Sequence, residues 1–498
     1  MRLSLRASLV APIAFALGLA AVAAVVLGLQ LDGFEAGFWI DEAIAVGIAS
    51  HELADIPAAL RLDGSPPLYY LLLHGWLLVV GTEEAATRGL SLFFAVLAVP
   101  VAWWAGRAIG GPRAGALAAV GAAGCPFAVQ YAQETRMYSL VIVLSLLASA
   151  GFVLAFVQGR RRHLITVAAA LVLLLYTHTW GVFLAAGLGV GWLWLRRRGR
   201  VTTRDGLMVL AVVGLAYAPW LPTLLSQSRH TGAPWAEAPS LLKLLDVPGR
   251  LFGYVTAPVL AIAIVLSWRR GLGRRREAVL ALVVVGAAAT GLAWGASQVQ
   301  PVWAGRYYAV LMGPFLLAAA TVLARGAGRW AVVALVGVGL TWMITDPPAV
   351  KSNARTVATG VAVSLRPGDL VICTQPEQVP VLDRYLPRGL NYVTLTGFVP
   401  DPRVTDWRDG VERMRAATFE RELEPWLAGA PRGRRILLVT PVIERRPGQA
   451  PWDRIVRYRS RQWGRAIRED VRLRPLAELP RSTFPRRPSA IRAELFER

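Results

Sequence analysis

Two adjacent carboxylates, Asp41 and Glu42, follow an aromatic and apolar segment, Phe38–Ile40. Apolar surroundings raise the pKa of a carboxyl group and can make it a usable general base. The same pair is also typical of a helix start, in which Asp41 would cap a helix over 42–50. The two roles are compatible, so Asp41 is a candidate base whether or not it also caps a helix.

A second polar group occupies a short segment, 130–138, between two apolar runs. It contains Glu134 and Arg136, flanked by Tyr131 and Tyr138. The planar fork of donors on arginine suits a phosphate group. The alternative is a Glu134–Arg136 ion pair that only fixes the turn.

Other candidates lie at or near the ends of apolar runs. Arg306 and Tyr307 begin one run, where snorkelling of the guanidinium to the membrane interface is the alternative to ligand binding. His178 lies at a helix mouth, where a histidine is more often a structural hydrogen-bonding residue than a ligand. Tyr69 and His74, on a short apolar segment, are weaker candidates for substrate contact.

A divalent cation is possible but not required by the sequence. Asp41, Glu42, His51 and His74 could supply ligands, although their spacing is not that of a specific metal motif. The H-E-x-x-H zinc motif is absent from the sequence. No cofactor is therefore assured.

The candidate residues lie at the ends of apolar segments or between them, and these segments are predicted to span a membrane. The chain has 498 residues, of which 55% are hydrophobic and 17% charged, whereas a soluble protein carries about 25% charged residues. About eleven apolar runs are near the length that crosses a bilayer. They lie at 9–29, 88–106, 113–130, 137–158, 164–176, 178–195, 206–225, 250–268, 278–298, 306–324 and 329–345. The sequence thus predicts a polytopic α-helical membrane protein.

Arginine distribution predicts the orientation of these spans. Loops near 107–113, 160–162, 196–200, 269–276 and 325–329 are rich in arginine, which places them in the cytoplasm together with the N-terminus. The candidate residues and the C-terminal region then lie outside the cytoplasm. The net charge of +22 is explained by these loops and lipid headgroups rather than by nucleic acid, because no basic stripe with interleaved aromatics appears.

Two further regions lie on the predicted outer side. The first outer loop, 30–87, contains an apolar stretch over 65–81, which is only about 15 residues long and is predicted as an interfacial or re-entrant helix. The C-terminal region, 350–498, is rich in arginine and proline. Its runs at 370–374, 391–396 and 436–439 predict strands and its 409–428 segment predicts helix, so we expect a transmembrane module over 1–349 and a small α/β domain over 350–498.

The order of four segments resembles the GT-C glycosyltransferase superfamily. These are the Asp41–Glu42 pair, Asp63–Tyr70, Gly81–Arg88 and Tyr131–Tyr138. The chain is most similar to the bacterial branch related to protein O-mannosyltransferases and aminoarabinose transferases, a glycosyltransferase family 39-like group.

This resemblance implies transfer of a sugar from a polyprenyl-phosphate donor to a protein, lipid or glycan hydroxyl on the outer face of the cell membrane. Asp41 would be the base with Glu42 orienting it. Glu134 and Arg136, with Tyr131 and Tyr138, would contact the donor, and Arg306 would bind phosphate. His74, His178, Tyr69 and Tyr307 would be possible substrate contacts. A single base opposite an already ionised leaving group implies inversion at the anomeric carbon.

Two alternatives stay open from the sequence. One is a transporter or flippase of lipid-linked sugars, a class that needs polar or broken helices at the bilayer midplane; the apolar span centres disfavour it. The other is a non-catalytic envelope-assembly protein that acts through its outer domain. The sugar, the carrier length and the acceptor are not specified by the sequence.

Overall fold

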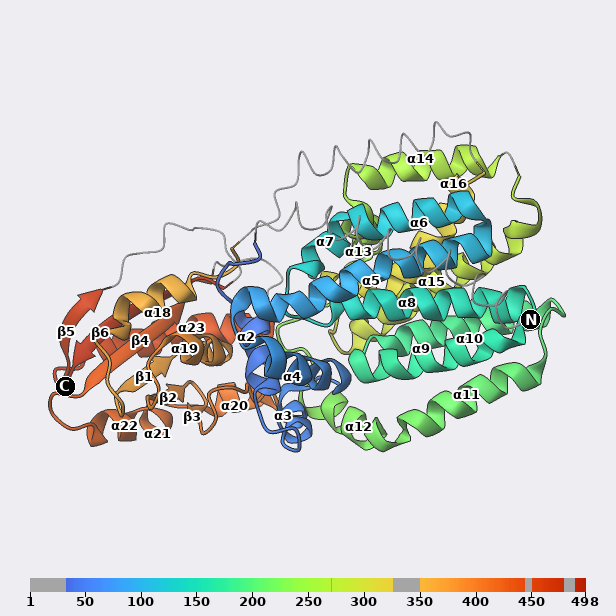
Figure 1. The fold of residues 1–498 in the computed structure, drawn as a ribbon. Coiled ribbons are helices and arrows are strands. Elements are labelled where there is room, and N and C mark those ends of the chain that lie inside the picture. The colour runs from blue at the N-terminus through green and yellow to red at the C-terminus, as the bar shows by residue number, and fades with distance from the viewer. Residues whose placement is uncertain (1–32, 270, 326–349, 444–449, 479–488) are drawn as a thin grey trace.

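The computed structural model describes residues 33–269, 271–325, 350–443, 450–478 and 489–498. A helical bundle occupies one half of the molecule and a sheet domain the other, with short helices between them (Figure 1). The first and last predicted spans, 9–29 and 329–345, lie outside the described residues.

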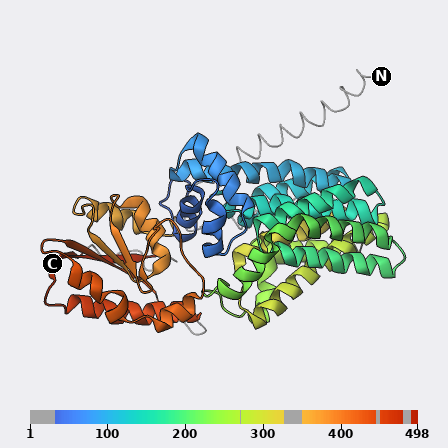
Figure 2. The same ribbon diagram turned by 90° about the horizontal axis from the view of Figure 1, so that it is seen from below.

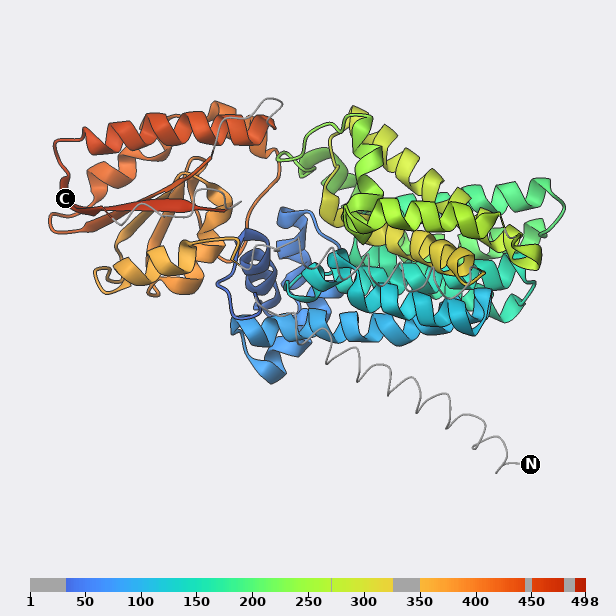
Figure 3. The same ribbon diagram turned by 90° about the horizontal axis from the view of Figure 1, so that it is seen from above.

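The bundle consists of mostly apolar helices, of which the longer ones run side by side (Figures 1 and 3). They are α5 (Glu84–Gly110), α6 (Pro112–Gly124), α7 (Pro126–Ala132), α8 (Tyr138–Phe152), α9 (Leu164–Thr177), α10 (Gly181–Arg197), α11 (Thr203–Tyr217), α12 (Leu221–His230), α13 (Leu242–Phe252), α14 (Thr256–Trp268), α15 (Arg276–Val299) and α16 (Met312–Leu323). A 3₁₀ segment, Gly305–Leu311, leads into α16.

The bundle is that of a multi-pass membrane protein, but the count of eleven spans is not confirmed. Five helical segments in the described part of the chain are long and apolar enough to cross a membrane, and up to seven if two bent pairs each form one span. Helices α9 and α10 have 14 and 17 residues, fewer than the roughly 20 that a span usually needs.

The two bent pairs have local causes in the sequence. Helices α6 and α7 meet at 51°, where Cys125 is extended because the residue before a proline disfavours helical geometry. Helices α13 and α14 meet at 93°, where Gly253 adopts a positive φ of 92° that a side chain would oppose.

Three short helices separate the bundle from the sheet domain: α2 (Ile40–Ala49), α3 (Ile56–Asp63) and α4 (Leu68–Val80). Figure 2 shows this group from below, between the other two parts. Helix α4 has 13 residues, too few to cross a bilayer, so a short helix forms within 65–81 and its interfacial or re-entrant placement stays a prediction. Leu78 and Val79 near its end are exposed, as expected for a helix lying against lipid.

The C-terminal domain is built on one six-stranded sheet with the order β3-β2-β1-β4-β6-β5. The strands are β1 (Leu370–Cys373), β2 (Asn391–Thr394), β3 (Gly397–Phe398), β4 (Arg435–Pro441), β5 (Arg474–Glu478) and β6 (Ile491–Glu497). Strand β1 is parallel to β2 and β4, whereas β6 is antiparallel to β4. The three strands predicted from sequence are β1, β2 and β4, so a sheet-containing domain is confirmed.

Helices cover both faces of this sheet (Figure 1). They are α18 (Ala354–Ala362), α19 (Val379–Tyr385), α20 (Gly410–Ala416), α21 (Phe419–Glu422), α22 (Glu424–Gly429) and α23 (Pro451–Arg468). The helical pattern predicted over 409–428 is broken into α20, α21 and α22. Proline and a capping threonine explain the breaks, because Thr418 accepts a bond from the Arg421 backbone N–H and Pro425 lies at the start of α22.

The sheet domain is fixed to the segments before α2 and α5 by polar contacts. The Tyr385 hydroxyl donates to Glu84 Oε1 at 2.7 Å and accepts from the Phe38 backbone N–H at 2.8 Å. Nearby, Arg384 donates to both the hydroxyl and the carbonyl of Thr82 at 2.9 Å. These bonds link α19 to the start of α2 and of α5.

One contact of this interface predicts a pH dependence of stability. His51 Nε2 lies 2.7 Å from Asp401 Oδ2. The hydrogen bond with Asp401 raises the pKa of His51 above 6.5. Burial alone would raise the pKa of Asp401, but bonds from His51 and Arg403 outweigh it and hold that pKa below 3.8. The His51 contribution is complete below pH 6.5 and is lost as pH rises through its raised pKa, whereas the Asp401 contribution is lost as pH falls through its lowered pKa.

We therefore expect the Tm of the purified protein to fall by a few degrees from about pH 6 to about pH 8, with the pair most stabilising between about pH 4 and 6.5. The His51→Gln variant should lose this part of the profile. His230→Gln is the matched control, because His230 and its partner Asp409 are 50% and 54% exposed. An unchanged slope in His51→Gln would show that the pair does not titrate as described.

Candidate active site

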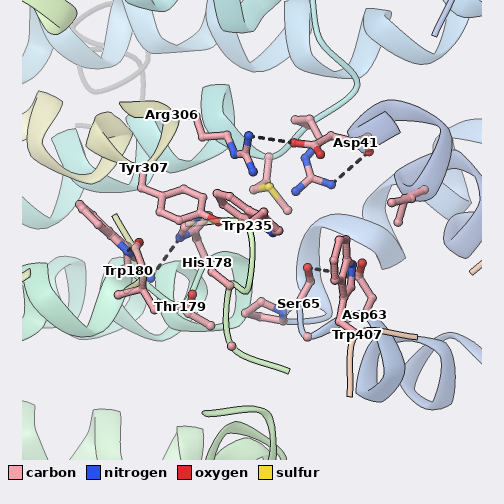
Figure 4. A pocket seen from close by; sticks show the side chains of 18 residues that line it. Asp41, Asp63, Ser65, His178, Thr179, Trp180, Trp235, Arg306, Tyr307 and Trp407 are labelled. Carbon is pink, nitrogen blue, oxygen red and sulfur yellow. Dashed lines mark hydrogen bonds and ion pairs between the residues drawn. The ribbon is translucent and has the colours of Figure 1, made fainter. Parts of the chain in front are cut away.

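A polar cavity of about 130 Å³ lies where the short helices α2 and α3 meet the ends of the bundle helices. Helices α2 and α3, the α7–α8 and α9–α10 turns and the 3₁₀ segment before α16 all contribute to its wall (Figure 4). Its charged lining residues are two carboxylates, Asp41 and Asp63, and two guanidiniums, Arg136 and Arg306. Segment 232–235 and Trp407 also line the cavity, which thus gathers groups from distant parts of the chain.

Asp41 faces this cavity from the first turn of α2. Its Oδ2 lies 3.4 Å from Arg306 Nη1, and the two side chains are 17% and 20% exposed. Arg136 Nη1 donates to the backbone carbonyl of Asp41 at 3.2 Å. Within the described part of the chain, Asp41 Oδ2 accepts no hydrogen bond of good geometry. One carboxylate oxygen is therefore oriented by a guanidinium and is still able to accept a proton.

Glu42 points the other way, into the protein. Arg88 Nε and Nη2 donate to its two oxygens at 2.8 and 2.7 Å, and both side chains are at most 3% exposed. The Thr135 backbone N–H adds a third bond to Glu42 Oε1 at 2.9 Å. With both oxygens occupied, Glu42 fixes the α7–α8 turn against α2. Its carboxylate does not line the cavity.

Aromatic rings surround the Arg306 guanidinium. It lies 4.3 Å from the Trp235 ring centroid, 5.5 Å from Tyr307 and 6.0 Å from Trp39. Such faces attract a cation and hold its plane in place. Arg306 Nε has no hydrogen-bond partner among the residues that the structure describes. An anion entering the cavity would meet a positioned guanidinium with unused donors.

Arg136 approaches the same cavity from the α7–α8 turn. Besides the carbonyl of Asp41, its Nη1 lies 3.5 Å from the Tyr70 hydroxyl, and its guanidinium lies 6.0 Å from the Tyr138 ring. Its side chain does not pair with Glu134, so the ion pair considered as an alternative from sequence is not formed. Arg136 and Arg306 together give the cavity two positive groups near Asp41.

Glu134 pairs with Lys351, a residue of the C-terminal region. The Lys351 Nζ also lies 4.5 Å from the centroid of the Trp39 ring. Burial raises the pKa of Glu134, and the neighbouring Lys351 opposes that rise. Glu134 is 4% exposed and does not line the cavity.

His178 lines the cavity beside Tyr307, with ring centroids 4.7 Å apart. Its Nδ1 accepts a bond from the Trp180 backbone N–H at 3.0 Å (Figure 4). A nitrogen that accepts carries no proton, so in the neutral ring Nε2 carries it. The ring is therefore a neutral hydrogen-bond donor.

Four predicted residues lie in the surrounding structure and do not line the cavity. Tyr131 and Tyr138 pack on each other with ring centroids 4.7 Å apart. Tyr69 is buried, with its hydroxyl 3.4 Å from Ser91 Oγ. His74 Nδ1 lies 2.9 Å from the carbonyl of Ala49. These contacts shape the wall around the site.

The cation ligands considered from sequence are not brought together. Glu42 is bonded to Arg88, His51 to Asp401 and His74 to the carbonyl of Ala49. In the described ranges, no group of three or more His, Cys, Asp and Glu side chains is arranged to hold a metal ion. The charge beside Asp41 is supplied by guanidiniums, so this donor set does not fit a divalent cation.

Several residues of the site were missed or ranked low from sequence. Arg88 and Asp63 stand out in the sequence only as ends of two motif segments, with no role of their own at a site. Asp63 lines the cavity and accepts from Ser65 Oγ at 2.6 Å. Trp235 has no distinguishing signal in the sequence. Lys351 is distinguished only by its rarity, as one of two lysines in the chain. Their roles depend on contacts between distant segments.

The chain has little similarity to known sequences but a clear similarity in structure. No protein-family model and no curated protein sequence matches it. The structure of ArnT from Cupriavidus metallidurans in the apo state matches 97% of this chain and 98% of ArnT, with a TM-score of 0.64 and 14% identity. ArnT bound to undecaprenyl phosphate matches over the same shares with a TM-score of 0.63 and 14% identity.

A second similar protein is the archaeal oligosaccharyltransferase AglB from Archaeoglobus fulgidus, in complex with an inhibitory peptide and a dolichol-phosphate. It matches 76% of this chain and 64% of AglB, with a TM-score of 0.51 and 12% identity. ArnT, an aminoarabinose transferase, and AglB are both GT-C proteins. The resemblance seen in the sequence motifs is thus confirmed at the level of structure: the chain has the GT-C fold.

Proposed function

We propose that this protein is a glycosyltransferase that moves a sugar from a polyprenyl-phosphate donor to an acceptor hydroxyl. The observation that carries the proposal is the 3.4 Å approach of Asp41 and Arg306 inside a polar cavity at the end of an apolar bundle. This approach places a carboxylate that can accept a proton beside a guanidinium that can bind a phosphate. The polyprenyl phosphates bound by ArnT and AglB support the same donor class.

The chemistry needs two kinds of group, and the cavity has both. Asp41 would take the proton of the acceptor hydroxyl as its oxygen attacks the anomeric carbon. The bond from that carbon to the phosphate oxygen breaks, and the electron pair leaves with the carrier phosphate. Arg306 and Arg136 would stabilise this anion as charge develops on it. With one base and no second carboxylate needed as nucleophile, the configuration at the anomeric carbon inverts.

An apolar groove offers a place for the lipid of the donor. It has a volume of about 500 Å³ and lies between α13, α14, α15 and α16. The helical run Gly305–Leu323 carries Arg306 at its start and Phe315 in the groove. The first part of this run is a 3₁₀ helix, with a rise of about 2.0 Å per residue, and the rest is an α-helix, with about 1.5 Å. The groove therefore begins roughly 16 Å along the run from Arg306, a distance that a polyprenyl chain spans.

The arginine distribution supports a reaction on the outer face of the cell membrane, with the N-terminus in the cytoplasm and the C-terminal domain outside. The first test is incubation of the purified protein with a panel of polyprenyl-phosphate sugars, scoring release of free carrier phosphate. Release with one sugar supports the proposal. Movement of an intact donor across a proteoliposome membrane without release would instead support a transporter.

The Arg306→Ala variant, which lacks the guanidinium, should transfer sugar about 100-fold more slowly, as expected for one lost hydrogen-bond donor to a developing anion. Arg306→Lys should recover part of the activity, since it restores the charge but not the planar fork. The measurement is steady-state kcat and KM for the donor. Arg229→Ala, at an exposed position in the last turn of α12, is the control. Equal activity of Arg306→Ala and this control would refute the assignment.

Filling the apolar groove should weaken binding of long-chain donors. An added Cβ at Gly291 meets no atom within 4 Å, so Gly291→Phe places a ring in the groove without a backbone clash. We expect the KM for a long-chain donor to rise about tenfold, corresponding to a loss of about 1.4 kcal/mol, with little change for a short-chain analogue. Gly295→Phe, also without an atom within 4 Å but outside the groove lining, should behave as the wild type. An equal effect on both donors would argue against the groove as the lipid site.

A further inference from the structure

We propose that a second cavity, here called the lateral cleft, binds an uncharged oligosaccharide. This is the acceptor glycan if the proposed function holds. The cleft has a volume of about 670 Å³. Its walls are the end of α2 and α3 on one side, and the β2–β3 turn and segment 399–413 of the C-terminal domain on the other.

The charges of the lateral cleft are compensated within it. Arg403 donates to both oxygens of Asp401 at 3.0 Å. In the same way, Arg408 donates to both oxygens of Asp406 at 2.9 and 3.0 Å. Asp55 and Arg413 complete a set of three carboxylates and three guanidiniums, and His51, which also lines the cleft, adds a positive charge only below its raised pKa. Paired side chains of this kind offer donors and acceptors without a net field, which suits neutral hydroxyls better than phosphates.

Two polar atoms in the lateral cleft are buried and unused. Thr405 is 5% exposed, and its hydroxyl has no hydrogen-bond partner in the described ranges. Arg413 Nε is also buried and has no hydrogen-bond partner in these ranges. Buried polar atoms normally have partners, because leaving one unpaired costs about 1–3 kcal/mol. A ligand rich in hydroxyl groups would satisfy both atoms.

An aromatic platform lies in the same cleft. Phe398 is 46% exposed although it is apolar, and its ring stacks on Trp426 at 4.9 Å and 14°. A ring held flat by a second ring loses little conformational entropy on binding. Its exposed face suits the apolar C–H face of a sugar ring, whereas the threonine and arginine donors of the wall suit the hydroxyl edge.

The lateral cleft shares a wall with the cavity that contains Asp41. Leu62 lines the cleft and the next residue, Asp63, lines the cavity. On the facing segment, Asp406 and Arg408 line the cleft while Trp407 lines the cavity. The Trp407 backbone N–H donates to the carbonyl of Leu62 at 3.0 Å, closing the wall. Figure 4 shows Trp407 beside Asp63 at this edge of the cavity. A glycan in the cleft would therefore extend to within one residue layer of the site of transfer.

The test is direct binding of fluorescently labelled neutral gluco-, manno-, galacto- and arabino-oligosaccharides to the purified full-length protein. We expect at least one to bind, with the same Kd at low and high salt, since no net charge is involved. Phe398→Ala and the near-isosteric Thr405→Val should each weaken that binding, Phe398→Ala by about tenfold. Tyr458→Ala, which removes another aromatic that is 66% exposed on α23, should not.

Other outcomes would overturn the inference. It fails if no neutral oligosaccharide binds, if only phosphorylated glycans or peptides bind, or if both cleft variants bind as the wild type. Carrier-phosphate release, measured in the same preparations, separates this result from the proposed function. Binding that is lost in Phe398→Ala, in a protein that turns over no donor, supports the lateral cleft and refutes the transferase. If the donor is turned over normally and both variants bind the oligosaccharide as the wild type does, only the lateral-cleft proposal is refuted.

Discussion

Replacement of Asp41 by asparagine should lower the rate of sugar transfer by about 100- to 10,000-fold, the usual contribution of a positioned general base. The amide keeps the size of the side chain but cannot take the proton of the acceptor hydroxyl. Donor binding should change far less, because Arg306 and Arg136 remain. The measurement is kcat under saturating donor, with the Kd for the carrier phosphate determined separately.

Glu52→Gln is the matched control for this prediction. Glu52 lies in the same outer loop, directly after α2, but is exposed and lines neither cavity. It should retain full activity. If Asp41→Asn kept wild-type kcat while remaining folded and membrane-inserted, the assignment of the base would be wrong.

Breaking the Arg88–Glu42 pair should have the largest effect on stability. Both side chains are at most 3% exposed, and removal of one member of a buried pair leaves an uncompensated charge that costs about 3 to 5 kcal/mol. We expect Arg88→Met to lower the Tm strongly in detergent. The double variant Arg88→Met/Glu42→Gln should recover much of the loss, because no charge is then left unpaired.

The comparison is Arg161→Ala, which breaks a pair whose arginine side chain is 63% exposed. Exposed pairs contribute about 1 kcal/mol or less, so its Tm should stay near that of the wild type. A double variant no more stable than Arg88→Met alone would mean that the charge is not the cause. An Arg88→Met protein with wild-type Tm would show that the α2–α5 contact does not depend on this pair.

The candidate site was partly predictable because its chemistry is local in the sequence. Asp41 and Arg306 stand out as charged residues next to apolar runs, where polar groups are costly and tend to be functional. The structure brings both to one cavity. His178 and Tyr307 were found for the same reason, since each lies at the mouth of an apolar helix.

The residues that were missed depend on contacts between distant segments. Arg88 lies 46 positions from Glu42, and Lys351 lies 217 positions from Glu134, so neither spacing carries a periodic signal. The fold shows the same limit. Strands β1, β2 and β4 are apolar and were predicted, whereas β5 is exposed along its whole length and gives no hydrophobic pattern.

The Lys351–Glu134 pair also limits where the chain can be cut or joined to a different C-terminal domain. The Lys351 ammonium reaches out of the C-terminal region to a carboxylate that is 5% exposed in the bundle half. A chain cut before residue 350, or a chimera with a foreign outer domain, would strand that carboxylate without its counter-ion. Grafting between relatives should therefore place the junction downstream of Lys351, so that lysine and glutamate are inherited together.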